Sequence, residues 1–422
     1  MEHLGPQEGL APGLLERRLI SNAAAHAVGA WCQHDPVSRR SPVRVAASTV
    51  RYWFRSARNG GVRRAERNGS FDGAFYEAMV RSAELVAVRT DDDEKAHQVL
   101  ASALQATLTD PDIQSRLVSS LKADAPRMLS EHRRLNARFM ARLHKRWGTA
   151  LDLFYIVQVA SEEIGADAYR AACSDELNRD ERGLLEAVSG LQARACRVSF
   201  EVYELLEAGF PRGAQARART LHEIAVVAFV LSKLGGTPGH EDIGRRFAAF
   251  DHVSNWKDAQ EHQKYAHRLG QEPLNPEEMK QIKAARDAAV QEFPDLDRKL
   301  GWAGDVPGLK SRTLTELEVL AGIDHLRPYY SWASHEVHAN PKGSRLNIVD
   351  GSDGQVKLTG RTNIGLADPA QSALIALNQT TSALIVCPGA STPSGILGMQ
   401  AVAALLEEAC QEFARISREM AS

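Results

Sequence analysis

The sequence contains few of the residues and motifs that would assign it to a familiar chemical class. Its five cysteines are scattered over 422 residues with no C-x-x-C pair, which predicts reduced, buried thiols and excludes a disulfide framework. The motifs G-x-x-x-x-G-K-[ST] and G-x-S-x-G are absent, and no G-x-G-x-x-G follows a strand pattern. Nucleotide-hydrolase and α/β-hydrolase functions therefore have no support in the sequence.

Long apolar runs are also missing. The longest uninterrupted one, Ile224 to Leu231, has eight residues, whereas a membrane-spanning helix needs roughly 18 or more. The N-terminal segment MEHLGP has no basic stretch followed by an apolar one, so no secretory signal is visible. We expect a cytoplasmic protein with no membrane partner.

Charge of one sign is not in excess. The 51 basic and 53 acidic residues leave a net charge of −2, which removes the strongest argument for a general nucleic-acid binder. The average conceals two basic regions. Residues 1–70 carry eleven arginines against five acids, and residues 127–146 carry seven basic residues against one acid. RNA or DNA is therefore predicted as a partner only through the N-terminal part of the chain.

The apolar pattern is that of a helical protein. Aromatic residues make up only 6% of the chain, and alanine supplies much of the 44% apolar content, which favours closely packed helices. The 3.6-residue period predicts helices over residues 14–31, 72–88, 93–108, 111–123, 127–147, 151–163, 180–208, 214–234, 240–268, 275–292, 313–338, 368–387 and 395–419.

One segment has a different period. Leu346–Asp350 and Gln355–Thr359 flank a Gly-Ser-Asp-Gly turn, which predicts a β-hairpin. The predicted fold class is therefore all-α, a helical bundle with one small β-hairpin insertion near residues 345–360. A polar break near residue 178 predicts two domains: a partly basic N-terminal helical region over 1–178 and a C-terminal helical domain over 179–422.

A first polar constellation opens the helix predicted over 214–234. Arg217, Arg219, His222 and Glu223 precede an almost fully apolar stretch. Arg219 and Glu223 are four residues apart and share one face of a helix. They line a polar pocket, or they form an ion pair that only satisfies both groups at the helix mouth; the sequence leaves both interpretations open.

A second constellation lies near the end of the helix predicted over 313–338. Tyr330, Ser334 and His338 follow each other at four-residue steps and form a ladder on one helix face. His338 has the chemistry of a general acid, a general base or a phosphate ligand. Alternatively, it caps the last carbonyls of its helix, because proline at position 341 ends that helix. The histidines in this region lack metal-site spacing, so we predict no metal and no cofactor.

A basic helix is predicted over 127–147. The apolar residues of this helix are expected to face the core, namely Met128, Leu135, Phe139, Leu143 and Trp147. Arg134, Arg138 and Arg142 would then be exposed and could hold a nucleic-acid backbone by charge neutralisation. A solvated or salt-bridged surface is the alternative interpretation.

The Arg-x4–6-His pattern of HEPN-type ribonucleases occurs about as often as chance predicts. Among its matches, Arg217/His222 is the one that lies on the helix with the first constellation. The pattern therefore adds little to a nuclease hypothesis, and it favours this pair only weakly.

The two constellations together resemble a bacterial family of unknown function, number 5677. In that family an arginine and a glutamate one turn apart head a hydrophobic helix, and a later helix carries an aromatic residue, a serine and a histidine that are followed by proline. The similarity covers about residues 180–400 and falls on Arg219, Glu223, Tyr330, Ser334, His338 and Pro341. The resemblance implies that these residues share one pocket.

Two functional hypotheses follow. In the first, the protein is an effector in stress or phage defence that acts on nucleic acid, at best a HEPN-like ribonuclease. His338, Glu223 and Arg219 are then catalytic, and the supporting residues are Tyr330, Ser334, Arg217 and His222. In the second, the protein is a non-catalytic helical scaffold or a sensor of a small anion or other ligand. The sequence leaves both a monomer and a homodimer open.

Overall fold

The structure is a computed structural model, and it describes residues 111–174, 176–304, 306, 308–339, 341–345, 348–351 and 354–421. The helices expected over 14–31, 72–88 and 93–108, together with Cys32, lie outside the described residues. The chain divides into two units, residues 1–136 and 137–422. The helices around the candidate site all belong to the second unit.

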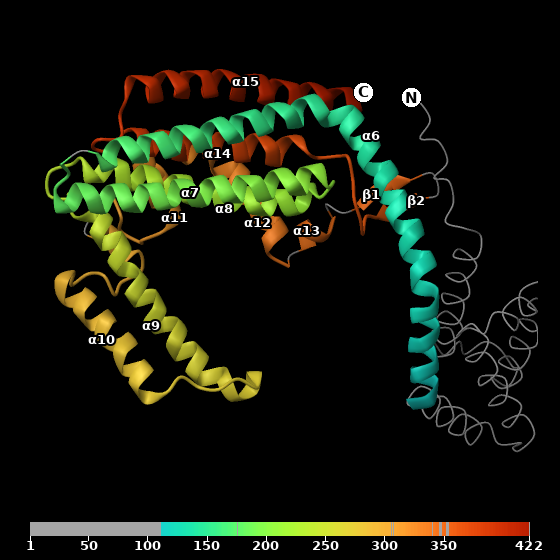
Figure 1. The fold of residues 1–422 in the computed structure, drawn as a ribbon, viewed down its shortest axis with the longest axis horizontal. Coiled ribbons are helices and arrows are strands. Elements are labelled where there is room, and N and C mark those ends of the chain that lie inside the picture. Colours follow the sequence, from blue (N-terminus) through green and yellow to red (C-terminus); the bar gives the residue numbers. More distant parts are fainter. Residues whose placement is uncertain are drawn as a thin grey trace, which may run out of the picture. The chain divides into compact units, whose positions relative to one another are not determined.

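The long elements of the described chain are α-helices, which confirms the all-α fold class (Figure 1). In chain order the α-helices are α6 (Pro111–Cys173), α7 (Arg179–Glu207), α8 (Pro211–Gly235), α9 (Ile243–Leu269), α10 (Pro276–Glu292), α11 (Leu314–Ala321), α12 (Arg327–Val337), α13 (Pro341–Arg345), α14 (Ala367–Ile385) and α15 (Pro393–Ala421). Two short 3₁₀ turns are inserted, η1 (Gly301–Ala303) and η2 (Asp324–Leu326).

Polar side chains start several of these helices. Asn275 caps α10 by accepting from the backbone of Glu277 and Glu278, while the Glu278 side chain returns to the Asn275 N–H. Asn178 caps α7 in the same way together with Glu181. The start of α10 is the one that its Asn-Pro-Glu-Glu sequence predicts. Residue 178, the predicted domain boundary, is therefore the N-cap of a helix in the second unit.

The helices predicted over 111–123, 127–147 and 151–163 are one continuous helix, α6, so the predicted helix start at Pro126 is wrong. Proline removes one backbone donor, but the turn before it contains helix-forming lysine and alanine, and the helix continues through.

The single helix predicted over 313–338 is likewise wrong, because the chain is broken there into α11, η2 and α12. Gly322 ends α11 with a left-handed backbone, φ 78°, and its N–H returns to the carbonyls of Glu318 and Val319. Pro328 then stands in the first turn of α12, where a proline needs no backbone partner.

The predicted β-hairpin is present. β1 (Ile348–Gly351) and β2 (Gly354–Lys357) pair antiparallel, with Ile348 opposite Lys357 and Gly351 opposite Gly354. This two-stranded sheet is the only one in the described residues. It matches the insertion near 345–360.

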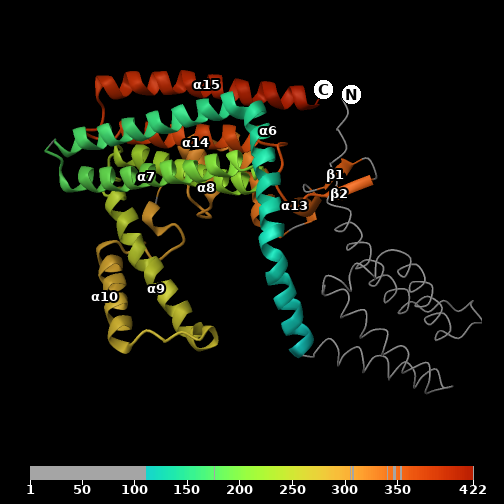
Figure 2. The same cartoon turned by 45° about the vertical axis from the view of Figure 1, so that its right-hand side comes forward.

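The core lies between α8 and the helices around it. α8 packs against α7, α9, α11, α12 and α14, and α14 packs in turn against α15. Figure 1 and the turned view in Figure 2 show the second half of α6 with α7, α8, α14 and α15 side by side, while α9 and α10 form a hairpin that extends from them. None of the described helices is long and apolar enough to cross a membrane.

Close approach of two backbones fixes where α9 crosses α7. A Cβ added to Gly244 would lie 2.4 Å from the backbone of Leu184, so only glycine fits at this crossing. Gly190, in the middle of α7, has nothing within 4 Å of the corresponding position. These two glycines provide a matched pair for testing the packing.

Gly244→Ala is expected to destabilise the protein by about 1–3 kcal/mol or more, because the added methyl group meets backbone that cannot rotate away. Gly190→Ala is expected to stabilise it by roughly 0.5–1 kcal/mol, because alanine favours a helix. Thermal unfolding followed by far-UV circular dichroism measures both changes. Equal midpoints for the two variants would contradict the close α7–α9 crossing.

Candidate functional site

The site is built on α8, whose body is buried against neighbouring helices. The residues from Ile224 to Leu231 are apolar and mostly buried, so the polar residues of α8 are concentrated in its N-terminal half. A charged side chain so close to a core must find a partner or reach water. In the structure, each charged side chain of α8 has a partner.

Tyr330 connects the two charged residues that head α8. Its hydroxyl accepts a hydrogen bond from Arg219 Nη2 at 2.6 Å and donates one to Glu223 Oε1 at 2.8 Å. Arg219 and Glu223 are also paired directly, at 3.2 Å. The structure therefore brings these three predicted residues together, and it joins α12 to α8 at this point.

Two guanidinium groups and one imidazole ring lie close to the ring of Tyr330. The guanidinium carbons of Arg219 and Arg327 lie 4.7 Å and 4.9 Å from the ring centroid, and the His222 ring lies at 5.4 Å. Burial raises the pKa of the Tyr330 hydroxyl, the Arg219 guanidinium lowers it, and the Glu223 carboxylate raises it. The hydroxyl therefore stays protonated and serves as a bridge between two charges.

A second network lies beside the first and contains a residue that the sequence did not reveal. The side chain of Glu318, on α11, is completely buried. Its Oε1 is 2.8 Å from His222 Nε2, and its Oε2 accepts from Arg327 Nη1 at 3.0 Å. Glu318 belongs to no recognisable motif. The two-residue spacing from Glu316 to Glu318 suits an exposed helix as well as a buried one, so it does not indicate that Glu318 is buried.

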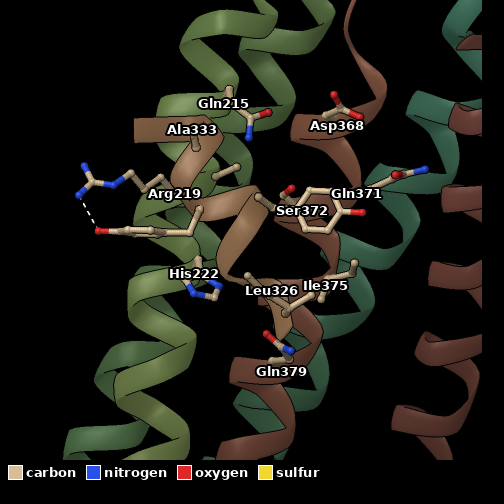
Figure 3. A pocket seen from close by; sticks show the side chains of 14 residues that line it. Gln215, Arg219, His222, Leu326, Ala333, Asp368, Gln371, Ser372, Ile375 and Gln379 are labelled. Carbon is tan, nitrogen blue, oxygen red and sulfur yellow. Dashed lines mark hydrogen bonds between the residues drawn. The ribbon is translucent and has the colours of Figure 1, made fainter. Parts of the chain in front are cut away.

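A cavity of about 190 Å³ opens next to these networks, between α8, η2, α12 and α14 (Figure 3). Its α8 wall consists of Gln215, Ala218, Arg219 and His222. Its second wall consists of Leu326, Tyr329, Tyr330 and Ala333, and its α14 wall consists of Asp368, Gln371, Ser372, Ile375, Ala376 and Gln379. The lining mixes three amides, three hydroxyl groups, an imidazole, two charged side chains and apolar surface.

Two polar atoms at this cavity are buried and lack a hydrogen-bond partner. They are the side-chain carbonyl oxygen of Gln379 and Nε of Arg219. Nearly all buried polar groups in folded proteins are satisfied by protein atoms or by ordered water, so these two atoms are expected to bind water or another polar group. The α14 residues, which sequence reasoning missed, are amides and small residues without a motif.

The structure does not bring His338 to this cavity. His338 is the exposed C-cap of α12, eight residues and about 12 Å along the helix from Tyr330. It lines a separate open depression with His335 and Ser344. The hydroxyl of Ser334 donates to the Tyr330 carbonyl at 2.9 Å, so it is directed at the backbone of its own helix.

Arg217 and His222 also face different partners. Arg217 pairs with Glu201 of α7 at 2.5 Å, whereas His222 contacts Glu318 of α11. Residues five apart on a helix lie roughly 140° apart around its axis, which explains the divergence. Of this pair, only His222 lines the cavity.

The predicted nucleic-acid-binding residues lie on α6. Arg134, Arg138 and Arg142 are exposed, and none of them has an ion pair with a described residue. The predicted apolar stripe of this helix is buried only in part: Leu143 and Trp147 are 1% exposed, whereas Met128 and Leu135 are 48% and 42% exposed. The expectation that the whole stripe faces the core is therefore wrong at its N-terminal end.

Metal-binding side chains are not clustered in the described residues: no group of three or more histidine, cysteine, aspartate or glutamate side chains could hold an ion there. The described cysteines are free. Cys196 and Cys387 are buried as expected, and burial raises their thiol pKa values to about 12 and about 11. Cys173 is exposed, in contrast to the prediction of a core residue.

Two carboxylates of the site differ in burial, and their removal should separate folding from ligand recognition. Glu318→Ala is expected to cost on the order of 3 kcal/mol, because it leaves His222 and Arg327 without their buried counter-charge. Glu223→Ala is expected to cost about 1 kcal/mol or less, because the Glu223 side chain is 42% exposed. Thermal unfolding of both variants measures the difference. A loss of several kcal/mol in Glu223→Ala would show that the Tyr330 network serves folding.

Comparison with known proteins gives one family match over part of the chain and no activity. Residues 185–355 match a family of unknown function (DUF5677), which confirms the resemblance seen in the two constellations. The match includes both networks and strand β1, and it ends within β2, before α14. No curated protein and no solved structure matches the chain.

Proposed function

We propose that this protein binds a small polar ligand in the cavity between α8, α12 and α14. The observation that carries the proposal is the position of the cavity beside two side-chain networks. One network holds Arg219 through Tyr330 and Glu223, and the other holds His222 through Glu318. The cavity wall is therefore ordered in advance, which lowers the entropic cost of binding.

The lining supports a ligand of modest size. Pockets for drug-sized ligands usually measure about 300–1,000 Å³, whereas this cavity measures about 190 Å³. Polar groups from α8, α12 and α14 line it, and polar groups on several sides can hold one small molecule in a fixed orientation. A non-catalytic ligand-sensing domain is the function that agrees best with this geometry.

Ligand binding can be tested with a thermal-shift library of amino acids, sugars, nucleosides, carboxylates and phosphates applied to the full chain. A ligand at one hundred times its Kd is expected to stabilise the protein by about 2.7 kcal/mol. Ser372→Phe fills the cavity from α14 and should abolish the stabilisation. Ser391→Phe, at an exposed position before α15, is the control and should retain it.

Native mass spectrometry of the freshly purified protein provides an independent readout of the same site. A co-purified small molecule should be present in the wild-type chain and absent from Ser372→Phe. If no compound stabilises the wild-type chain more than it stabilises Ser372→Phe, the ligand-binding proposal is wrong.

Nucleic-acid binding is a second proposal, favoured by the basic surface of α6. Arg138, Arg142 and Arg146 repeat every four residues, are exposed, and have no ion pair with a described residue. Arg134 continues the same spacing. A row of unpaired guanidinium groups suits a phosphate backbone, whose neutralisation releases counterions. In its strongest form this proposal is a defence-related ribonuclease in which His338 transfers protons at the depression that it lines with His335 and Ser344.

Fluorescence anisotropy with labelled RNA and DNA tests the second proposal. Replacing Arg138, Arg142 and Arg146 by alanine should weaken binding and reduce the slope of log K against log salt concentration by about three. The triple replacement of Lys257, Lys264 and Lys280 by alanine, on α9 and α10, is the charge-matched control. Unchanged affinity in the arginine variant contradicts the proposal, and total RNA left intact by the wild-type chain contradicts its nuclease form.

A further inference from the structure

We propose that the ligand of this cavity is an uncharged, planar nitrogen heterocycle, a nucleobase or its nucleoside. The inference rests on the proposed function of the cavity as a small-ligand site, and it names the class of molecule that fits. It depends on three observations: the charge balance of the walls, the amide groups that face the cavity, and an exposed aromatic pair at its edge.

The charges in the walls are already balanced. Arg219 is paired with Glu223 at 3.2 Å, and His222 faces Glu318, which also binds Arg327. No cation of the cavity wall is left for a phosphate or a carboxylate. The one further charged residue in the lining, Asp368, is an exposed carboxylate without an ion pair in the described chain. An anionic ligand would therefore meet repulsion, and a neutral ligand would not.

The polar groups that remain are mainly carboxamides. Gln215 comes from α8, and Gln371 and Gln379 come from the face of α14 that lines the cavity (Figure 3). The side-chain NH₂ of Gln371 donates to the Cys410 carbonyl at 2.8 Å, which fixes this amide and leaves its oxygen as an acceptor. The oxygen of Gln379 is buried without a partner. The three glutamines therefore place carboxamide groups, which both donate and accept hydrogen bonds, in the wall of the cavity.

Carboxamides recognise molecules that present donors and acceptors side by side in one plane. Such an edge is what a nucleobase offers, and glutamine and asparagine read adenine in this way. A sugar offers hydroxyl groups without a common plane, and an amino acid carries charges that the balanced walls do not match. The donor and acceptor pattern thus favours a heterocycle over both.

An aromatic surface lies at the edge of the cavity. Tyr329 lines it and remains 47% exposed, and Trp332, 55% exposed, meets the Tyr329 ring edge to face with centroids 5.9 Å apart. Contiguous exposed aromatic side chains are a common feature of ligand-binding and interaction surfaces. An exposed aromatic ring beside amide groups gives a flat ligand both a stacking face and an edge to read.

Size and the position of Asp368 complete the argument. A cavity of about 190 Å³ accommodates one ring system and leaves a sugar outside it. Asp368 lies in the first turn of α14, and carboxylates commonly accept hydrogen bonds from ribose hydroxyls. A base inside the cavity with its ribose near Asp368 uses both features.

Isothermal titration of the full chain with the four ribonucleosides, adenine, guanine, adenosine monophosphate and free ribose tests the inference. At least one base or nucleoside should bind, its monophosphate should bind more weakly, and ribose should not bind. Tyr329→Ala and Gln379→Leu should each weaken that binding about tenfold. The matched controls, Tyr265→Ala on α9 and Gln400→Leu on α15, should leave it unchanged.

The possible results separate this inference from the proposed function. If the thermal-shift library yields a ligand of another class that Ser372→Phe excludes, while no base or nucleoside binds, the heterocycle inference is wrong and the ligand-binding proposal stands. If neither the library nor the nucleosides bind, both are wrong. Tighter binding of the monophosphate than of its nucleoside contradicts the charge argument.

Discussion

A carboxylate that is completely removed from water must be compensated, and the carboxylate of Glu318 imposes that requirement on the helices around it. His222 of α8 and Arg327 of α12 both meet it, so α8, α11 and α12 are joined at one point. Arg327 also contacts the ring of Tyr330, whose hydroxyl holds Arg219 and Glu223. One buried charge thus organises the wall of the cavity, and the order of that wall does not depend on a ligand.

The fold was predictable where its causes are local. The start of α10 follows from Asn275 and the acidic residues after it, and the hairpin follows from two short strands around a glycine-rich turn. The interruptions were less predictable. Pro126 was expected to start a helix but lies inside one, and Gly322 was not recognised as the end of one. Whether a proline or glycine breaks a helix depends on how the neighbouring turns pack, and the spacing of apolar residues does not contain that information.

The site was predictable to the extent that it is helical geometry. Arg219 and Glu223 share a face because they are four residues apart, and the four-residue ladder includes Tyr330, whose hydroxyl bonds to Glu223. The same ladder also included His338, which lies two further steps along the helix and does not line the cavity. Glu318 and the amides of α14 were not predictable from the sequence. His222 lies 96 residues before Glu318, Cys410 lies 39 residues after Gln371, and glutamine is common on any helix surface.

The family match covers one part of the cavity lining and leaves out the other. Both networks lie within residues 185–355, whereas α14, with Gln371, Gln379 and Asp368, lies after them. Neither part encloses the cavity alone, because α8, η2 and α12 line one side of it and α14 lines the other. A chain shortened to the matched residues would therefore keep both networks and lose one wall of the cavity.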